Sequence, residues 1–279
     1  MTADPIRVVR RPSGNPLRRA QIAIGSVLIL LTAGAWMLLV QGQRGSMHGG
    51  AVTPTMGLAA PVFLGVWLVM VAAMMFPATA PMLLMFARVA ANRRTNSRAW
   101  VPTIFFTLGY LIVWSAVGAT AFGFGSLSEW LARRFDVVAA VGPRVGALLI
   151  VAAGVFQFSA LKDRCMTECR SPLAFLTMHW REGARGAVTM GMRHGVVCVG
   201  CCWALMAILF PLGMMNIAAL GLVTTLIFAE RVLPGGKALQ LAAGVALLGL
   251  GAAAFVSPDM LPGGTASMGD TMQMSGAMP

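Results

Sequence analysis

The sequence predicts an all-α, polytopic membrane helical bundle with about seven transmembrane helices. Hydrophobic residues make up 58% of the 279 residues and charged residues only 11%, a composition typical of membrane proteins rather than soluble enzymes. Several separate apolar runs reach the roughly 20 residues that cross a bilayer core. The net charge of +12 comes from basic residues between these runs. This pattern favours a lipid bilayer, and not a nucleic acid, as the partner.

The apolar runs set the expected order of elements. A basic segment (1–19) comes first, a seven-helix domain covers 20–256, and a Met-rich outer tail over 257–279 has too little apolar surface to fold. The first run is longer than a signal-peptide core and no small-residue cleavage site follows it, so we expect a retained anchor. The expected spans are Ala20–Val40, Pro61–Ala87, Trp100–Gly125, Ala139–Leu161, the run ending near Gly213, Met214–Glu230 and Ala238–Val256.

The distribution of Lys and Arg predicts the orientation. With the N-terminus inside, sixteen basic residues lie on the inner side and four on the outer side, while Arg193 lies at the inner boundary. This bias predicts an inner-membrane protein with its N-terminus in and its C-terminus out. The four outer residues are Arg44, Arg133, Arg134 and Arg144.

The fifth expected span carries the strongest candidate site. His194, Cys198, Cys201 and Cys202 fall within one broad stripe of a helix. Thiolates and imidazole suit soft or borderline metals, with Cu(I) and Zn(II) the leading choices. The alternative is that buried Cys acts as a small apolar side chain. One helix cannot surround an ion, so a metal site needs donors from a second helix.

Methionines of the second span are the expected donors. Met74 and Met75 lie together, with Met70 one turn away and Met82 further along, although each could be core filler. Met214, Met215 and Asn216, beyond the fifth span, would extend the row of donors to the outer surface. Met47, His48 and the Met residues of the tail favour capture of Cu(I) outside the membrane.

Two further Cys patterns leave the chemistry open. Cys165-x3-Cys169 lies in a basic inner loop, where it allows a two-coordinate Cu(I) site, a reversible disulfide or no function. Cys198-x2-Cys201 also matches a thiol–disulfide exchange motif, but no thioredoxin-type βαβ pattern surrounds it. The chain shows no phosphate loop, nucleotide fingerprint or Ser/His/acid set, which favours a non-enzymatic role. Glu230 is expected to pair with a nearby Arg.

Long blocks of the sequence resemble a bacterial family of predicted metal-binding integral membrane proteins of unknown function, some labelled copper chaperones. The blocks are Val69–Met82, Cys165–Pro172, Gly191–Met206, Gly213–Asn216 and Glu230–Gly236. The resemblance implies a metal-handling role in the membrane. We therefore expect a protein that binds Cu(I) and transports it or exchanges it with a donor or acceptor protein. A membrane thiol–disulfide oxidoreductase and a non-catalytic assembly factor remain alternatives.

Overall fold

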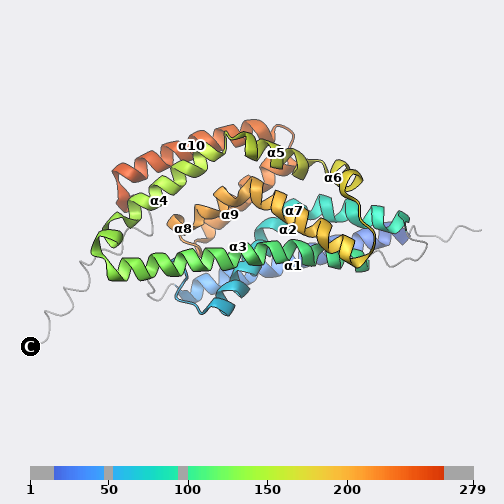
Figure 1. The fold of residues 1–279 in the computed structure, drawn as a ribbon, viewed down its shortest axis with the longest axis horizontal. Coiled ribbons are helices and arrows are strands. Elements are labelled where there is room, and N and C mark those ends of the chain that lie inside the picture. Colours follow the sequence, from blue (N-terminus) through green and yellow to red (C-terminus); the bar gives the residue numbers. More distant parts are fainter. Residues whose placement is uncertain (1–15, 47–52, 94–99, 261–279) are drawn as a thin grey trace, which may run out of the picture.

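Every regular element in the part of the chain that the structure describes is helical, as predicted. The computed structural model describes residues 16–46, 53–93 and 100–260, and the helices lie roughly along one long axis (Figure 1). Six of them contain stretches long and apolar enough to cross a membrane, as expected of a multi-pass membrane protein. These are α1 (Pro16–Ser46), α2 (Ala60–Arg93), α3 (Trp100–Arg134), α4 (Asp136–Phe156), α7 (Gly183–Ala207), whose stretch continues through α8 (Leu209–Leu212), and α10 (Gly236–Val256).

The sixth expected span, Met214–Glu230, is not among the candidate membrane spans of the described residues. It corresponds to α9 (Ile217–Val232), whose 16 residues rise about 24 Å against a hydrocarbon core of about 30 Å. The helix begins at Ile217 because the Asn216 side chain caps it, with its Oδ1 accepting from the backbone N–H groups of Ala218 and Ala219 at 3.1 and 3.2 Å. By length and composition the described residues therefore hold six candidate spans, with α9 packed among them.

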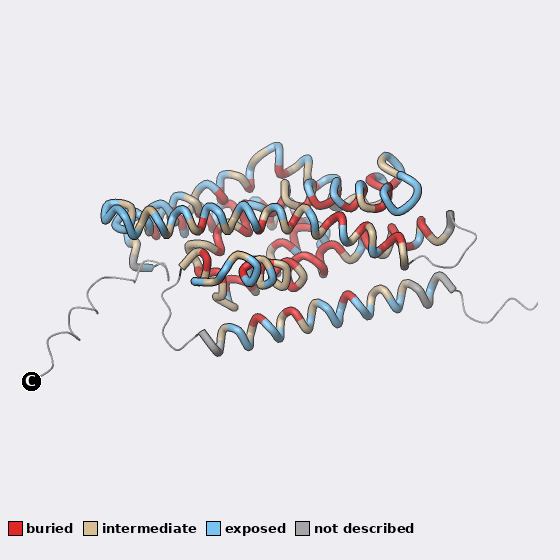
Figure 2. Tube along the Cα trace, turned by 60° about the horizontal axis from the view of Figure 1, so that its bottom comes forward, coloured by how far each residue is buried: buried red, intermediate tan, exposed pale blue. Residues whose placement is uncertain are grey.

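Two prolines leave carbonyl groups of α2 without their helical partners. Pro77 has no N–H, so the carbonyl oxygen of Ala73 loses its usual donor. The Trp36 Nε1 of α1 donates to this oxygen at 3.2 Å. A neighbouring helix thus satisfies the backbone group that the proline leaves open, as the interior of a membrane requires. This bond also fixes α1 against α2. Figure 2 shows α1 as a mostly exposed rod at one edge of the bundle.

Helices α3 and α7 pack most closely of all pairs, and glycines make this possible. A Cβ atom built on Gly191 would lie 1.9 Å from the Phe106 carbonyl oxygen, and one on Gly109 would lie 2.1 Å from that of Val188. Backbones that approach this closely leave no room for side chains at the crossing. The crossing fixes the face of α7 that carries the thiols.

The basic inner loop expected around Cys165 and Cys169 contains two short helices. They are α5 (Ala160–Arg170), which packs on α7, and α6 (Pro172–His179), which contacts α2 and α5. Ser159 caps α5 through its hydroxyl, which accepts from the Lys162 N–H at 3.2 Å. The expectation of a loop here is therefore wrong, because the segment is helical and contributes side chains to the core. Met166, Phe175 and Leu176 are all buried.

Candidate metal centre

The predicted stripe on α7 faces the protein interior. His194, Cys198, Cys201 and Cys202 are all 2% exposed or less. The thiols of Cys201 and Cys202 both donate to the Cys198 carbonyl oxygen, at 3.1 and 2.9 Å. The stripe is therefore turned away from lipid and toward neighbouring helices.

Helix α5 brings the remaining two cysteines to the same place. The Sγ atoms of Cys169 and Cys201 lie 3.6 Å apart, and all five cysteines of the chain are free thiols. A Cβ on Gly200 would lie 2.6 Å from the Sγ of Cys165, so the missing side chain at Gly200 gives that thiol its position. From the sequence, Cys165 and Cys169 were a pair of their own, with a Cu(I) site, a disulfide and no function left open. Instead they line the thiol site of α7, and we call these five cysteines the thiol cluster.

One of the α2 methionines, Met75, contacts the thiol cluster. The Cys202 thiol donates to the Met75 Sδ at 3.9 Å, which is the meeting of the two helices that the sequence predicted. Met70, Met74 and Met82 are buried in the same core, where they pack as apolar side chains. Of the predicted outer steps, Met214 is buried, Met215 is half-buried and the Asn216 side chain caps α9. Met47, His48 and the tail methionines beyond Met260 lie outside the described residues.

Arg231 and Tyr110 complete the surroundings of the thiols, and the sequence analysis missed both. The Arg231 Nη2 of α9 donates to the Sγ atoms of Cys201 at 2.8 Å, Cys198 at 3.0 Å and Cys202 at 3.9 Å. The Tyr110 hydroxyl of α3 lies 3.1 Å from the Cys198 Sγ. The guanidinium group is buried, and it therefore dominates the electrostatics of the site.

Glu230 has a different partner from the one predicted. Its carboxylate accepts from Lys162 Nζ at 2.6 Å and from Gln157 Nε2 at 3.2 Å, and Lys162 also donates to Gln157 Oε1. Glu230 and Lys162 are both buried, which is tolerated only when such charges are paired and hydrogen-bonded. The expected pairing with an Arg is wrong because α5 inserts a lysine from the supposed loop.

His194 lies one turn before Cys198 among aromatic rings. The ring centroids of Phe106 and Tyr110 are each 5.9 Å from that of His194, and the Phe175 centroid is 5.6 Å away. Neither ring nitrogen of His194 has a hydrogen-bond partner. An unpartnered buried imidazole is unusual, and the ring nitrogen that carries no proton is free to bind a metal ion.

The arrangement fits a soft ion held by few ligands. With metal–sulfur bonds of about 2.3 Å and a tetrahedral angle, two thiolates on one ion lie about 3.8 Å apart, near the 3.6 Å between Cys169 and Cys201. Among the described residues, no three side chains of the His, Cys, Asp and Glu types are grouped to hold a metal ion. A closed four-ligand zinc site is therefore not formed, whereas a thiol pair with thioethers behind it suits Cu(I).

The pKa values of the two α5 thiols are raised, which favours their protonated form before a metal ion binds. Burial, followed by the nearby Cys201, raises the pKa of Cys165. The hydrogen bond with Cys201, followed by burial, raises the pKa of Cys169 well above its usual value. Since a metal-bound thiol is deprotonated, an ion entering through α5 must release protons from these groups.

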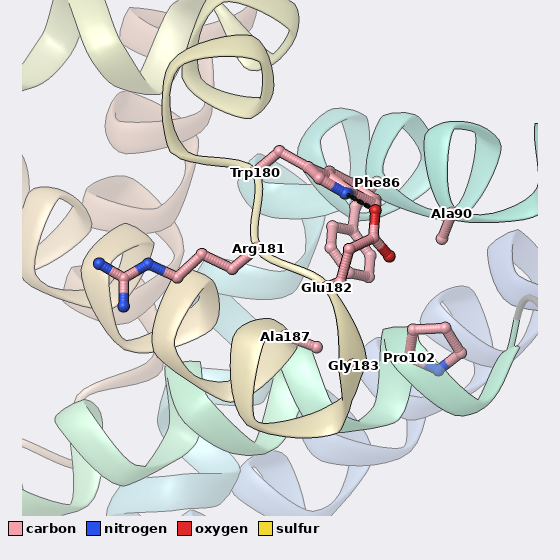
Figure 3. A pocket seen from close by; sticks show the side chains of 8 residues that line it. All are labelled: Phe86, Ala90, Pro102, Trp180, Arg181, Glu182, Gly183 and Ala187. Carbon is pink, nitrogen blue, oxygen red and sulfur yellow. Dashed lines mark hydrogen bonds between the residues drawn. The ribbon is translucent and has the colours of Figure 1, made fainter. Parts of the chain in front are cut away.

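The cavity drawn in Figure 3 is separate from the thiol cluster. It has a volume of about 10 Å³, room for about one water molecule. Above it Trp180 packs on Phe86 with ring centroids 5.6 Å apart, and Trp180 Nε1 donates to Glu182 Oε1 at 2.6 Å. These contacts hold the turn between α6 and α7 against α2.

Comparison with known proteins gives one match. The sequence model of the PpoB2 family, described as a copper chaperone, matches residues 64–254. The matched stretch includes α5, α7, α9 and nearly all of α2, and so every residue of the thiol cluster. No curated protein and no solved structure matches the chain. The family expected from the sequence blocks is thereby confirmed.

Proposed function

Because the chain belongs to this copper chaperone family, we propose that it binds Cu(I) at the thiol cluster and passes it to a partner protein in or at a bacterial inner membrane. The observation that carries the proposal is the meeting of Cys169 and Cys201, 3.6 Å apart on two different helices. Two thiols brought together by α5 and α7 provide a coordination sphere that neither helix could form alone.

A gradient of exposure across the cluster supports transfer rather than storage. Cys165 and Cys169 on α5 are partly exposed, whereas Cys198, Cys201 and Cys202 on α7 are buried. An ion carried by a partner's thiols would meet the α5 thiols first. It would then move by exchange of one ligand at a time toward Cys201, with the Met75 thioether beyond it. The excess of basic residues in the segments next to α5 favours its location on the cytoplasmic side.

His194 is an additional candidate ligand. Its two ring nitrogens have no partner in the protein, and it lies one helical turn from Cys198. The aromatic rings around it exclude water, so an ion bound there would be protected from exchange. The remaining methionines of α2 and those after α8 would then serve as weaker donors along a path toward the outer side. Whether copper crosses the membrane along this path is a separate hypothesis from its binding.

The test is the metal content of the purified full chain after growth with added copper under reducing conditions. We expect about one Cu(I) per chain in the unaltered protein and loss of most of it in Cys169→Ser and Cys201→Ser. Met178→Leu changes a methionine that is 77% exposed and serves as the matched control, with copper content unchanged. Copper retained by both Cys variants, or its absence from the unaltered protein, would contradict the proposal.

One observation favours a second candidate function, a thiol–disulfide oxidoreductase. The sequence suggested Cys198 and Cys201 as the redox pair, but Cys169 Sγ is 3.6 Å from Cys201 Sγ, which makes Cys169–Cys201 the better pair. Forming this disulfide would release two protons and pass two electrons to an acceptor such as a partner disulfide. Thiol trapping in growing cells separates the two functions. A redox enzyme cycles through this disulfide, whereas a Cu(I) carrier keeps both thiols reduced.

A further inference from the structure

Arg231 is a buried cation that faces sulfur instead of a carboxylate. Its side chain is 7% exposed, and its Nη2 donates to the Sγ of Cys201 at 2.8 Å and of Cys198 at 3.0 Å. A buried charge without a counter-charge is costly. The arrangement therefore requires an anionic group where the sulfur atoms lie.

The neighbouring carboxylate is not available to Arg231. Glu230 is adjacent in sequence, but Lys162 and Gln157 already hold both of its oxygens. The Lys162–Glu230 pair is fixed by packing, because α5, which carries Lys162, contacts α9, which carries both Glu230 and Arg231 near its end. In this way the fold reserves one full positive charge for the thiol cluster.

We propose that Arg231 makes the Cys169–Cys201 site selective for a monovalent soft cation, such as Cu(I) or Ag(I), over a divalent one such as Zn(II). The inference rests on the proposed function and deepens it. Thiols that bind a metal do so as thiolates, so the pair contributes two negative charges and Arg231 one positive charge. A monovalent ion brings this sum to zero, whereas a divalent ion leaves one uncompensated positive charge in the protein interior.

A third thiolate would reverse the preference, and the geometry argues against it. Cys198 is engaged by Arg231 and by the Tyr110 hydroxyl at 3.1 Å, and Cys202 donates to the Cys198 carbonyl oxygen and to Met75. In the described part of the chain no three His, Cys, Asp or Glu side chains form a group able to hold an ion. Neutral thioethers such as Met75 can add ligands without changing the charge.

The experiment measures the ratio of Ag(I) to Zn(II) affinity by competition on the purified full chain, with Ag(I) as the redox-inert monovalent probe. Arg231→Gln and Arg231→Leu remove the charge and add no strong metal donor, whereas Arg231→Lys keeps the charge. Charges about 5 Å apart at an effective dielectric constant near 20 change such a ratio by roughly 200-fold to 300-fold. We expect both neutral variants to shift the ratio toward Zn(II) by about this factor, and Arg231→Lys to stay within about fivefold of the unaltered protein.

Arg170→Gln is the matched control. It removes a positive charge at the same end of α9, where the guanidinium donates to the Leu233 carbonyl oxygen at 2.6 Å and not to sulfur, and we expect no change in the ratio. Should Arg231→Gln fail to fold, as judged by circular dichroism, the apolar Arg231→Leu decides.

Three results would overturn the inference. One is a ratio unchanged in the folded neutral variants. Another is a shift of equal size in Arg170→Gln. The third, which needs no variant, is an unaltered protein that binds Zn(II) within tenfold of Ag(I). A protein that binds neither ion at its thiols would instead overturn the proposed function itself.

Discussion

Replacing Gly191 by alanine should separate α3 from α7 and destabilise the fold around the thiols. The added Cβ would lie 1.9 Å from the Phe106 carbonyl oxygen, whereas carbon–oxygen contacts between helices are about 3.3 Å. The backbones must therefore part by roughly 1.4 Å, because a carbonyl oxygen cannot rotate away as a side chain can. The Tyr110 contact with Cys198 lies on the same two helices and should lengthen as they separate.

The expected magnitude is a balance of two effects. Overpacking of a filled interior costs about 1–3 kcal/mol, and the backbone position of the clash places this case in the upper part of that range. The higher helix propensity of alanine relative to glycine offsets up to about 1 kcal/mol of this cost. A net loss of about 1–2 kcal/mol remains, which corresponds to a drop of about 2–8 °C in Tm for a chain of this size.

The assay is thermal unfolding of the purified protein, followed by reaction of its buried thiols with a maleimide dye. Gly142→Ala is the matched control, because a Cβ at Gly142 would meet nothing within 4 Å. We expect the control to keep or slightly raise Tm while Gly191→Ala lowers it. Equal Tm values for the two variants would refute the close crossing of α3 and α7.

Three further predictions test contacts around the site. Met75→Leu should weaken Cu(I) binding about tenfold in competition with a chromophoric chelator, the size of effect typical of groups that support a metal site; an unchanged affinity would make Met75 a packing residue only. Lys162→Met should lower the free energy of unfolding by about 3–5 kcal/mol because it leaves Glu230 buried and unpaired, and changing Glu230 to Leu as well should restore most of the loss in denaturant titrations. Trp36→Phe should cost about 1 kcal/mol, seen as a Tm lower by about 2–4 °C, because it leaves the carbonyl opposite Pro77 without a donor; no change in Tm would mean that a water molecule fills that role.

The sequence predicted what depends on the period of a single helix. The spacing of His194, Cys198, Cys201 and Cys202 placed them on one face of a helix, and that face is buried. Met75, in the second apolar run, was predicted to meet these residues from a neighbouring helix. These predictions depend on residues only a few positions apart, whose relative directions are fixed by the geometry of a helix.

What the sequence could not predict depends on long-range packing. Cys169 reaches Cys201 because α5 folds back on α7 at Gly200, and the basic character of the segment concealed this. Orientation rules treat Lys and Arg between spans as solvated charges, so Lys162 and Arg231 were assigned to the inner surface. Both are buried. The α9 span was overestimated because its apolar run continues into residues that form the turn after α8 and the cap of α9.

The two buried cations, Lys162 and Arg231, explain why α5 carries a lysine next to the thiol cluster. Lys162, Arg231 and Glu230 form a buried set with one more positive than negative charge. Without Lys162, Glu230 would be a buried carboxylate with no cation against it, because side chains one residue apart on a helix do not face each other and Arg231 contacts the thiols. With Lys162 on Glu230, the guanidinium is left to sulfur. The ion pair between α5 and α9 thus holds Cys169 near Cys201 and keeps Arg231 directed at both Cys201 and Cys198, so the same contact controls the distance between the ligands and the charge of the site.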